Sequence, residues 1–313
     1  MKIVLCTSGA TRARYESAFS GALPEAQIRW RDATDESIHP QAEAADVAIV
    51  WKPPAALFAE QPSLRAVFNL GAGVDVLLGL PTLPANLPLF RLEDAGMAQP
   101  MARYALAAVL RHELRFDAYA SDQAQLRWSP AVPRNPTIMQ VGVLGLGAIG
   151  RVVATTLAAA GYAVRAYSRS PRELAGVTCY SGDHLDEFLT GLDSLVCILP
   201  LTPATTGLLD RRRLSLLAHG AHLINLGRGT HLVDADLVDL IDSGQLSGAT
   251  LDVFRVEPLP VGHPFWQRPQ ILITPHVSGL TQVDDAVRQV ADKLRAFWRG
   301  EAVSGRVDRE RGY

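Results

Sequence analysis

Three side chains with complementary chemistry each follow a strand-like run in the second half of the sequence. Arg228 follows the run at 221–226, Glu257 follows the run at 249–254, and His276 follows the run at 271–273. A guanidinium can hold a carboxylate and polarise the carbonyl beside it, and an imidazolium can donate a proton to the alkoxide that forms. A carboxylate bonded to the imidazole would orient it and stabilise its charged form. The set therefore predicts reduction of a carbonyl group.

Each of these residues alone is a weak indication of function. A lone histidine is usually structural or on the surface, and a glutamate before a proline is usually a turn residue. We interpret the other seven histidines in that way: His39, His112, His184, His219, His222, His231 and His263. The prediction rests on joint placement, because the carboxyl ends of parallel strands meet at one edge of a sheet, where ligands bind.

A glycine-rich turn earlier in the chain predicts the cofactor. The segment reads, in order, as a strand at 141–144, a turn with Gly145, Gly147 and Gly150, a helix at 148–160 and a strand at 163–167. This framing makes G-x-G-x-x-G a dinucleotide-binding fingerprint. The glycines allow a tight turn, approach of the pyrophosphate and close helix packing, and the helix N-terminus attracts the phosphates. A purely structural glycine turn is the alternative.

The end of the second strand indicates which nucleotide is bound. NAD-selective sites usually carry Asp or Glu here to bind the ribose 2′-hydroxyl. This sequence has Ser168, Arg169 and Ser170, with Arg172 close by, which together offer two guanidinium groups and two hydroxyls to a 2′-phosphate. We therefore predict a preference for NADP(H), with use of NAD(H) left open. An ordinary solvated basic turn is the alternative.

Length and composition limit the classes of protein to consider. At 313 residues, 48% hydrophobic and 20% charged, the chain predicts a globular protein of two domains. The formal net charge of −2 gives no electrostatic basis for binding nucleic acid or an anionic membrane. Three cysteines fit neither a metal site nor a disulfide framework, and neither a signal peptide nor a run of transmembrane length is apparent. We expect a cytoplasmic protein without a metal.

Alternating strand and helix patterns predict an α/β protein with two Rossmann-like, doubly wound parallel-sheet domains. The first, smaller and flavodoxin-like, is expected at 1–96 as a substrate-binding domain completed by 284–313, and the dinucleotide-binding domain at 97–283. One long helix is expected at 97–117. The proline-punctuated segment 121–135, which contains Trp128, is expected to be an arm that either forms a contact surface or packs back on its own domain.

These motifs together resemble those of the D-isomer-specific 2-hydroxyacid dehydrogenases, and within that family the glyoxylate/hydroxypyruvate reductase A subgroup. The resemblance covers essentially the full chain. It is carried by NLGAGVD (69–75), PLFRLEDAGM (88–97), GVLGLGAIG (142–150), YSRSPR (167–172), LPLTPATTGLL (199–209), INLGRG (224–229), LDVFRVEPLP (251–260), TPHVSG (274–279) and the tail GRVDRERGY (305–313).

The resemblance implies roles for individual residues. Arg228, Glu257 and His276 would be catalytic, Asp252 would lie near the nicotinamide carboxamide, and Met101 would pack on the ring. The implied substrate-binding residues are Trp51, Ala72, Gly73, Val74, Arg228 and His276. Together with the glycine turn and the basic turn, the residues expected at the cofactor are Met101, Gly145, Leu146, Gly147, Ala148, Ile149, Gly150, Ser168, Arg169, Ser170, Arg172, Leu199, Pro200, Thr205, Leu226, Gly227, Arg228, Asp252, His276, Ser278 and Gly279.

The resemblance also implies an activity and an assembly. The activity is NADPH-dependent reduction of glyoxylate to glycolate and of hydroxypyruvate to D-glycerate. Members of the family are usually homodimers, so an arm at 118–140 would embrace the partner subunit and Trp128 would reach the partner's site. Two alternatives stay open: a D-2-hydroxyacid dehydrogenase for bulkier 2-ketoacids such as phenylpyruvate, and a nucleotide-sensing corepressor-type binding protein.

Overall fold

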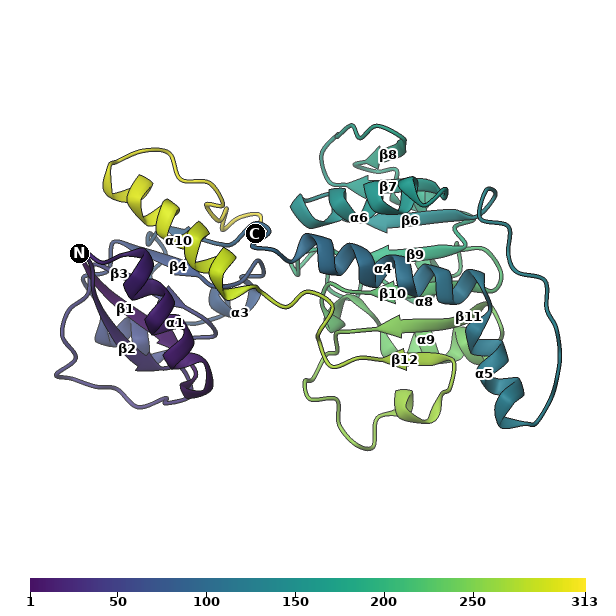
Figure 1. Ribbon diagram of the computed structural model, residues 1–313, viewed down its shortest axis with the longest axis horizontal. Helices are drawn as coiled ribbons and strands as arrows, with labels where there is room; N and C mark the ends of the chain where they lie inside the picture. Colours follow the sequence, from purple (N-terminus) through teal and green to yellow (C-terminus); the bar gives the residue numbers. More distant parts are fainter. The chain divides into compact units, whose positions relative to one another are not determined.

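The computed structural model describes residues 1–313, and the chain divides into two units (Figure 1). The sheet of each unit consists of parallel strands. The first unit comprises Met1–Gly96 and Thr281–Tyr313, and the second comprises Met97–Leu280. No helix in either unit combines the length and the apolar character needed to cross a membrane.

The first unit is a five-stranded parallel sheet with strand order β2-β1-β3-β4-β5, which is the flavodoxin-like order. Its elements are β1 (Lys2–Thr7), α1 (Gly9–Ala22), β2 (Gln27–Asp32), β3 (Val47–Val50), α2 (Ala56–Glu60), β4 (Ala66–Asn69), α3 (Asp75–Leu78), β5 (Leu89–Phe90) and α10 (Val283–Trp298).

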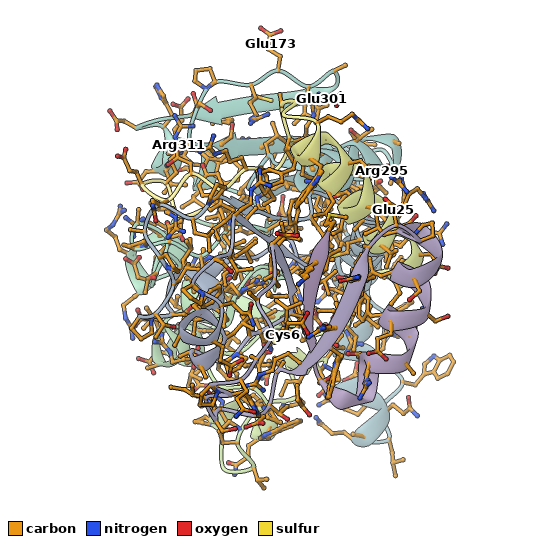
Figure 2. The ribbon with its side chains drawn as sticks, turned by 90° about the vertical axis from the view of Figure 1, so that its left-hand side faces the viewer. Cys6, Glu25, Glu173, Arg295, Glu301 and Arg311 are labelled. Atoms are coloured by element: carbon orange, nitrogen blue, oxygen red, sulfur yellow. The ribbon has the colours of Figure 1, made fainter.

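Strands β3 and β4 of this sheet are buried along their whole length, as expected for parallel strands covered on both faces. Helices α1 and α10 lie side by side (Figure 2), and Arg295 of α10 donates a hydrogen bond to the carbonyl of Ala22 at 2.5 Å. The C-terminal tail then pairs with β5, where Val307 N–H donates to Leu89 and Arg91 N–H donates to Gly305. The two ends of the chain therefore belong to one unit.

The second unit is a seven-stranded parallel sheet with strand order β8-β7-β6-β9-β10-β11-β12. Its elements are α4 (Ala98–Glu113), α5 (Phe116–Ala124), β6 (Gln140–Leu144), α6 (Ala148–Ala159), β7 (Ala163–Ser168), β8 (Val177–Ser181), α7 (Leu185–Leu189), β9 (Ser194–Cys197), α8 (Arg211–Leu214), β10 (Ala221–Asn225), the 3-10 turn η1 (Gly229–His231), α9 (Asp234–Asp242), β11 (Leu246–Leu251), the 3-10 turn η2 (Pro264–Gln267) and β12 (Ile271–Ile273).

This strand order places the chain reversal between β6 and β9, the switch point at which dinucleotides bind in doubly wound sheets. Helices α4 and α6 pack side by side on the sheet (Figure 1). The core contains the apolar faces of β9, β10 and β11 together with α9. The short strand β8 has no counterpart in the sequence prediction.

The single helix expected at 97–117 is wrong, because the chain breaks it into α4 and α5. Arg115 lies between them with φ of 61°, in the left-handed region that a non-glycine residue seldom adopts. Just before the break, the buried Glu113 accepts a hydrogen bond from Tyr162. The expected arm therefore begins with the helical turns of α5. The Tyr119 hydroxyl of α5 holds the following segment by donating a hydrogen bond to the carbonyl of Ala131 at 3.0 Å.

Candidate active site

Three neighbouring strands of the second unit deliver the predicted catalytic residues. Strands β10, β11 and β12 are consecutive in the sheet and parallel, so their carboxyl ends share one edge. Arg228 follows β10, Glu257 follows β11 and His276 follows β12. The expectation that three loops at one edge carry these side chains agrees with this topology.

Glu257 and His276 form a hydrogen-bonded pair. The Glu257 Oε2 atom lies 2.9 Å from His276 Nδ1, and its Oε1 atom accepts the N–H of Phe254 at 3.0 Å. Because the carboxylate accepts both bonds, Nδ1 of the imidazole carries a proton and the ring orientation is fixed. Both side chains remain partly exposed, so Nε2 of His276 is the ring atom left for chemistry.

The loop that carries Arg228 packs directly on the loop that carries Glu257. A Cβ placed on Gly229 would lie 1.9 Å from the carbonyl carbon of Phe254, so only glycine allows this approach. On the other side, the amide of Asn225 donates to the carbonyl of Arg228 at 3.0 Å. The backbone at Arg228 is thus held from both directions.

Asp252 holds the loop that carries His276. Its carboxylate is 0% exposed and accepts from the N–H groups of Val277 and Ser278, each at 2.9 Å, and from the hydroxyl of Thr274 at 2.6 Å. This loop places His276 at φ of 55°, a conformation that needs such support. The structure therefore gives Asp252 an anchoring role that its sequence position did not indicate.

A second group supports the same loop from α4. Because the Thr274 hydroxyl donates to Asp252, the Tyr104 hydroxyl must donate to Thr274, at 2.6 Å. Burial raises the pKa of Tyr104, so this donor stays protonated. Tyr104 and Thr274 were not predicted from the sequence, because their partners come from segments far apart in the chain.

The glycine turn has the geometry of a phosphate cradle. Gly145 has φ of 114°, and a Cβ on Gly150 would lie 1.8 Å from the carbonyl oxygen of Gly145. Gly147 caps α6, is exposed and has open space where a side chain would stand. Leu146 beneath it is buried, and Ala148 and Ile149 begin the helix. A larger residue at Gly147 would fill the space over the helix N-terminus that the fingerprint leaves to phosphate.

The basic turn follows β7 at the same edge of the sheet. Ser168 is buried, and its hydroxyl donates to the carbonyl of Ser170 at 2.8 Å, which folds the turn. Arg169, Ser170 and Arg172 are exposed. The neighbouring carboxylate, Glu173, projects into solvent (Figure 2). The turn thus offers exposed cations at the end of the second strand.

The loop after β9 is closed by its own side chains. The Thr205 hydroxyl donates to the carbonyl of Pro200 at 2.8 Å and accepts the N–H of Thr202 at 2.8 Å. Leu199 is half-buried at the start of this loop. A Cβ on Gly145 would lie 2.8 Å from the carbonyl oxygen of Ile198, so this loop also abuts the glycine turn.

The remaining cofactor candidates cluster beside these loops. Leu226 and Gly227 are buried directly after β10, and Gly227 N–H donates to Asn225 at 3.2 Å. Met101 of α4 is buried against Gly279, where a Cβ would lie 2.6 Å from the Met101 sulfur. The structure therefore brings Met101 to the end of the loop that carries His276 and Ser278.

Besides Arg228 and His276, the other four substrate residues implied by the resemblance lie in the first unit. Ala72, Gly73 and Val74 follow β4, and the amide of Asn69 holds the loop by donating to the carbonyls of Gly71 and Gly73 at 3.0 and 2.8 Å. Trp51 follows the adjacent strand β3 and is 39% exposed. A Cβ on Gly71 would lie 2.2 Å from the indole, so Trp51 rests on the backbone of this loop. Asn69 and Gly71 were quoted in a motif but not predicted as site residues.

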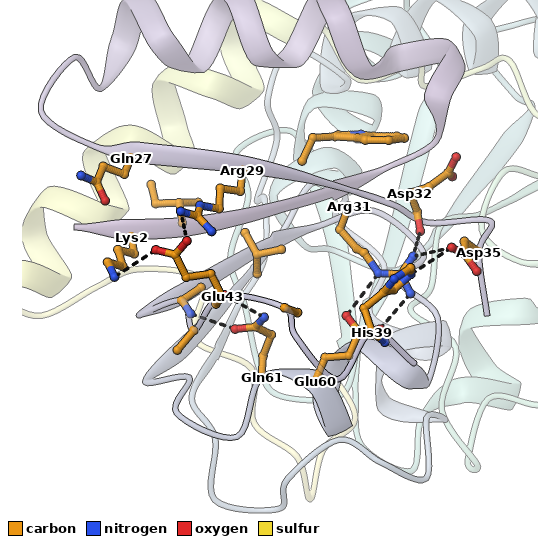
Figure 3. Close-up of a pocket in the computed structure, with 16 residues that line it drawn as sticks. Lys2, Gln27, Arg29, Arg31, Asp32, Asp35, His39, Glu43, Glu60 and Gln61 are labelled. Atoms are coloured by element: carbon orange, nitrogen blue, oxygen red, sulfur yellow. Dashed lines mark hydrogen bonds and ion pairs between the residues drawn. The ribbon is translucent and has the colours of Figure 1, made fainter. Parts of the chain in front are cut away.

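A separate cavity of about 370 Å³ lies beside β2 in the first unit and contains none of the predicted site residues (Figure 3). Its charged side chains are paired with one another: Arg31 with Glu60 at 3.0 Å, and Glu43 with Lys2 and Arg29. These ion pairs join charged side chains of the cavity to one another rather than to a predicted site residue.

Comparison with known proteins gives one consistent family. Residues 106–278 match the NAD binding domain of the D-isomer specific 2-hydroxyacid dehydrogenases. A glyoxylate/hydroxypyruvate reductase A from Serratia proteamaculans is 44% identical over 304 residues, which is 95% of each chain.

Solved structures agree over the full length. A D-isomer specific 2-hydroxyacid dehydrogenase from Xanthobacter autotrophicus Py2, in complex with NADPH and MES, has a TM-score of 0.92 and 40% identity over 99% of both chains. An NADPH-dependent glyoxylate/hydroxypyruvate reductase from Sinorhizobium meliloti, in complex with NADP and sulfate, has a TM-score of 0.92 and 34% identity over 100% of both chains.

Proposed function

This chain belongs to the D-isomer specific 2-hydroxyacid dehydrogenase family, and we propose that it is an NADPH-dependent reductase of glyoxylate and hydroxypyruvate. The products would be glycolate and D-glycerate. The observation that carries the proposal is the Glu257–His276 pair, held at 2.9 Å at the sheet edge where Arg228 also emerges. The names of the relatives at 40–44% identity support the same activity.

The residues of the second unit fit a dinucleotide. The open space at Gly147 and the backbone contact at Gly150 suit a pyrophosphate, and the exposed Arg169 and Arg172 suit a 2′-phosphate. Two structural relatives were solved with NADPH or NADP, which supports the preference for NADP(H). When bound, the reduced nicotinamide supplies the hydride.

The chain's own residues would manage the substrate and the proton. Arg228 binds the carboxylate and polarises the carbonyl, and His276 donates the Nε2 proton to the oxygen as it gains negative charge. Glu257 keeps the Nδ1 proton in place and stabilises the imidazolium before transfer. In the reverse direction, neutral His276 accepts the proton from the hydroxyl group.

In the first unit, we assign the Ala72–Val74 loop to the substrate carboxylate and Trp51 to the pocket wall. The loop's backbone N–H groups are a suitable anion nest, and its shape is fixed by Asn69. The bulk of Trp51 favours small 2-oxoacids such as glyoxylate over phenylpyruvate. These assignments follow the family resemblance.

We further propose that the protein is a homodimer that uses the arm at 118–140. Large apolar side chains stand exposed along this segment, including Leu126 and Trp128, each 96% exposed, together with Val132 and Ile138. Exposed apolar side chains concentrated on one segment are typical of a surface that another chain covers.

An NADPH-oxidation panel tests the proposed activity. Wild-type enzyme is offered glyoxylate, hydroxypyruvate, pyruvate and phenylpyruvate, each also with NADH. We expect the highest kcat/KM with the first two and NADPH. The His276→Ala variant should lose kcat by about 100-fold or more, which is the usual contribution of a positioned acid. Absence of NADPH oxidation with every 2-oxoacid would instead favour the binding-protein alternative.

A double variant tests the basis of cofactor preference. Replacing Ser168 by Asp and Arg169 by Ala removes one cation and introduces the carboxylate typical of NAD-selective sites. We expect kcat/KM with NADPH to fall relative to NADH. An unchanged ratio would show that the basic turn does not select the nucleotide.

A further inference from the structure

We propose that His231 is a positioning residue that holds the backbone of Arg228 in place for substrate binding. The inference rests on the proposed function, because it assigns a supporting role to the arginine of that same site. From the sequence alone, His231 was interpreted as one of seven structural or surface histidines, without a connection to the site. The structure instead gives it a defined set of partners.

The imidazole of His231 joins two loops at the carboxyl edge of the sheet. It lies in η1, is 0% exposed, and its Nδ1 atom accepts the N–H of Arg228 at 3.1 Å. Its Nε2 atom lies 3.3 Å from the carbonyl oxygen of Pro200, in the loop after β9. The ring therefore bridges the loop of the proposed catalytic arginine and a loop predicted to contact the cofactor.

These partners fix the tautomer of the ring. A backbone N–H can only donate and a carbonyl can only accept, so Nδ1 is unprotonated and Nε2 carries the proton. The Cys197 sulfur lies 3.7 Å from Nδ1, and burial raises the pKa of this thiol to about 12, so it stays a protonated donor. Neutral His231 thus accepts from the Arg228 N–H and donates to the Pro200 carbonyl.

Packing leaves the ring no freedom to turn away. A Cβ on Gly227 would lie 3.0 Å from Nδ1 and Cε1 of His231, so the ring lies close against the backbone just before Arg228. Just after Arg228, Gly229 is pressed against Phe254. Because the backbone is fixed on both sides of Arg228, the hydrogen bond from the Arg228 N–H to His231 determines where the Arg228 backbone lies. It therefore also determines the point from which the Arg228 side chain extends.

The two nitrogen atoms contribute unequally. The Pro200 carbonyl also accepts a hydroxyl proton from Thr205 at 2.8 Å, so it keeps a partner if His231 is replaced. The half-buried N–H of Arg228 donates to Nδ1, so a substitution that removes this acceptor breaks the hydrogen bond. We therefore expect the role of His231 to depend on Nδ1.

Three substitutions separate this role from simple packing. Asn at position 231 presents its amide oxygen near the place of Nδ1, Gln presents its amide near the place of Nε2, and Phe fills the space with neither. The readouts are oxalate affinity of the NADP⁺ complex by calorimetry, NADPH affinity by fluorescence, the KM for glyoxylate, and Tm. Oxalate is a 2-oxoacid mimic that cannot be reduced, so its binding reports the Arg228 site without turnover.

We expect His231→Asn to keep oxalate Kd and glyoxylate KM within about twofold of wild type. His231→Gln and His231→Phe should raise both about tenfold, equivalent to about 1.4 kcal/mol, with NADPH affinity nearly unchanged. Packing alone predicts the opposite order, because Asn leaves the larger cavity. The matched control is His222→Gln, another buried histidine on β10, which should lower Tm without changing oxalate affinity.

The outcomes distinguish the two proposals. Suppose that wild-type enzyme binds oxalate and oxidises NADPH, but His231→Gln binds oxalate as tightly as His231→Asn or more tightly. The role of His231 is then refuted and the proposed function stands. Parallel losses of NADPH affinity, oxalate affinity and Tm in all three variants would also refute it. If wild-type enzyme neither binds oxalate nor oxidises NADPH with any 2-oxoacid, both proposals fail.

Discussion

The second unit contains a pair of buried histidines whose neutrality should make its stability depend on pH. His112 of α4 and His222 of β10 stack with ring centroids 5.2 Å apart, and both are nearly inaccessible. Burial, with smaller contributions from nearby charges such as Arg134, lowers the pKa of each from 6.5 to about 3. His222 bonds to the Thr250 hydroxyl at 3.0 Å, while Nε2 of His112 has no partner.

The sign of the effect follows from proton binding. Between the unfolded pKa of 6.5 and the folded pKa of about 3, the unfolded chain binds protons that the folded chain does not. Stability is therefore fully present above 6.5 and falls as the pH is lowered toward 3. From about pH 7 to pH 5, each histidine should remove about 2 kcal/mol from the free energy of unfolding.

The assay is urea unfolding at a series of pH values with wild type and His222→Gln. The glutamine amide reaches the position of Nε2 and keeps a bond to Thr250, but it does not titrate. The variant should lose about 2 kcal/mol less than wild type between about pH 7 and pH 5. His219→Gln, at an exposed position, serves as the control and should keep the wild-type slope. Parallel pH dependence of wild type and His222→Gln would refute the reasoning.

Three further substitutions test contacts that the structure makes specific. Gly150→Ala would place a methyl group 1.8 Å from the Gly145 carbonyl, so NADPH Kd measured by fluorescence should rise about tenfold or more as the turn opens. Gly71→Ala would push a methyl group into the Trp51 indole, so the ratio of kcat/KM for glyoxylate to that for phenylpyruvate should fall; an unchanged ratio would exclude Trp51 from selectivity. Trp128→Ala should weaken the proposed dimer in sedimentation experiments, and an unchanged oligomeric state with unchanged KM would remove Trp128 from both the proposed interface and the proposed site.

The parts of the site that the sequence predicted are those set by strand topology. Apolar runs bounded by turn residues predicted the positions of β10, β11 and β12. Because these strands are parallel, the residues that follow them must lie at the same edge of the sheet. Arg228, Glu257 and His276 could therefore be placed together at one edge of the sheet before any distance was known. The glycine turn was predictable for the same reason, since its strand and helix are local in sequence.

The parts that the sequence did not predict depend on contacts between distant segments. The break at Arg115 involves neither glycine nor proline, and it follows residues anchored by Tyr162 and His222. Thr274 gains its role only because Tyr104 of α4 and Asp252 meet it. Such contact partners have no fixed spacing in the sequence, so no local sequence pattern predicts them.

The glycines show why spacing and contact carry different information. Gly161 and Gly176 have positive φ and open space around them, so they serve the backbone conformation of turns. Gly150 and Gly229 lack a positive φ, yet a Cβ on either would meet backbone atoms closer than 2 Å away. The first kind of glycine shapes one turn, whereas the second allows two segments to touch. In this protein the second kind lies at the nucleotide turn and beside Arg228, so the precision of the proposed site depends on backbone contacts that a glycine in the sequence permits but does not reveal.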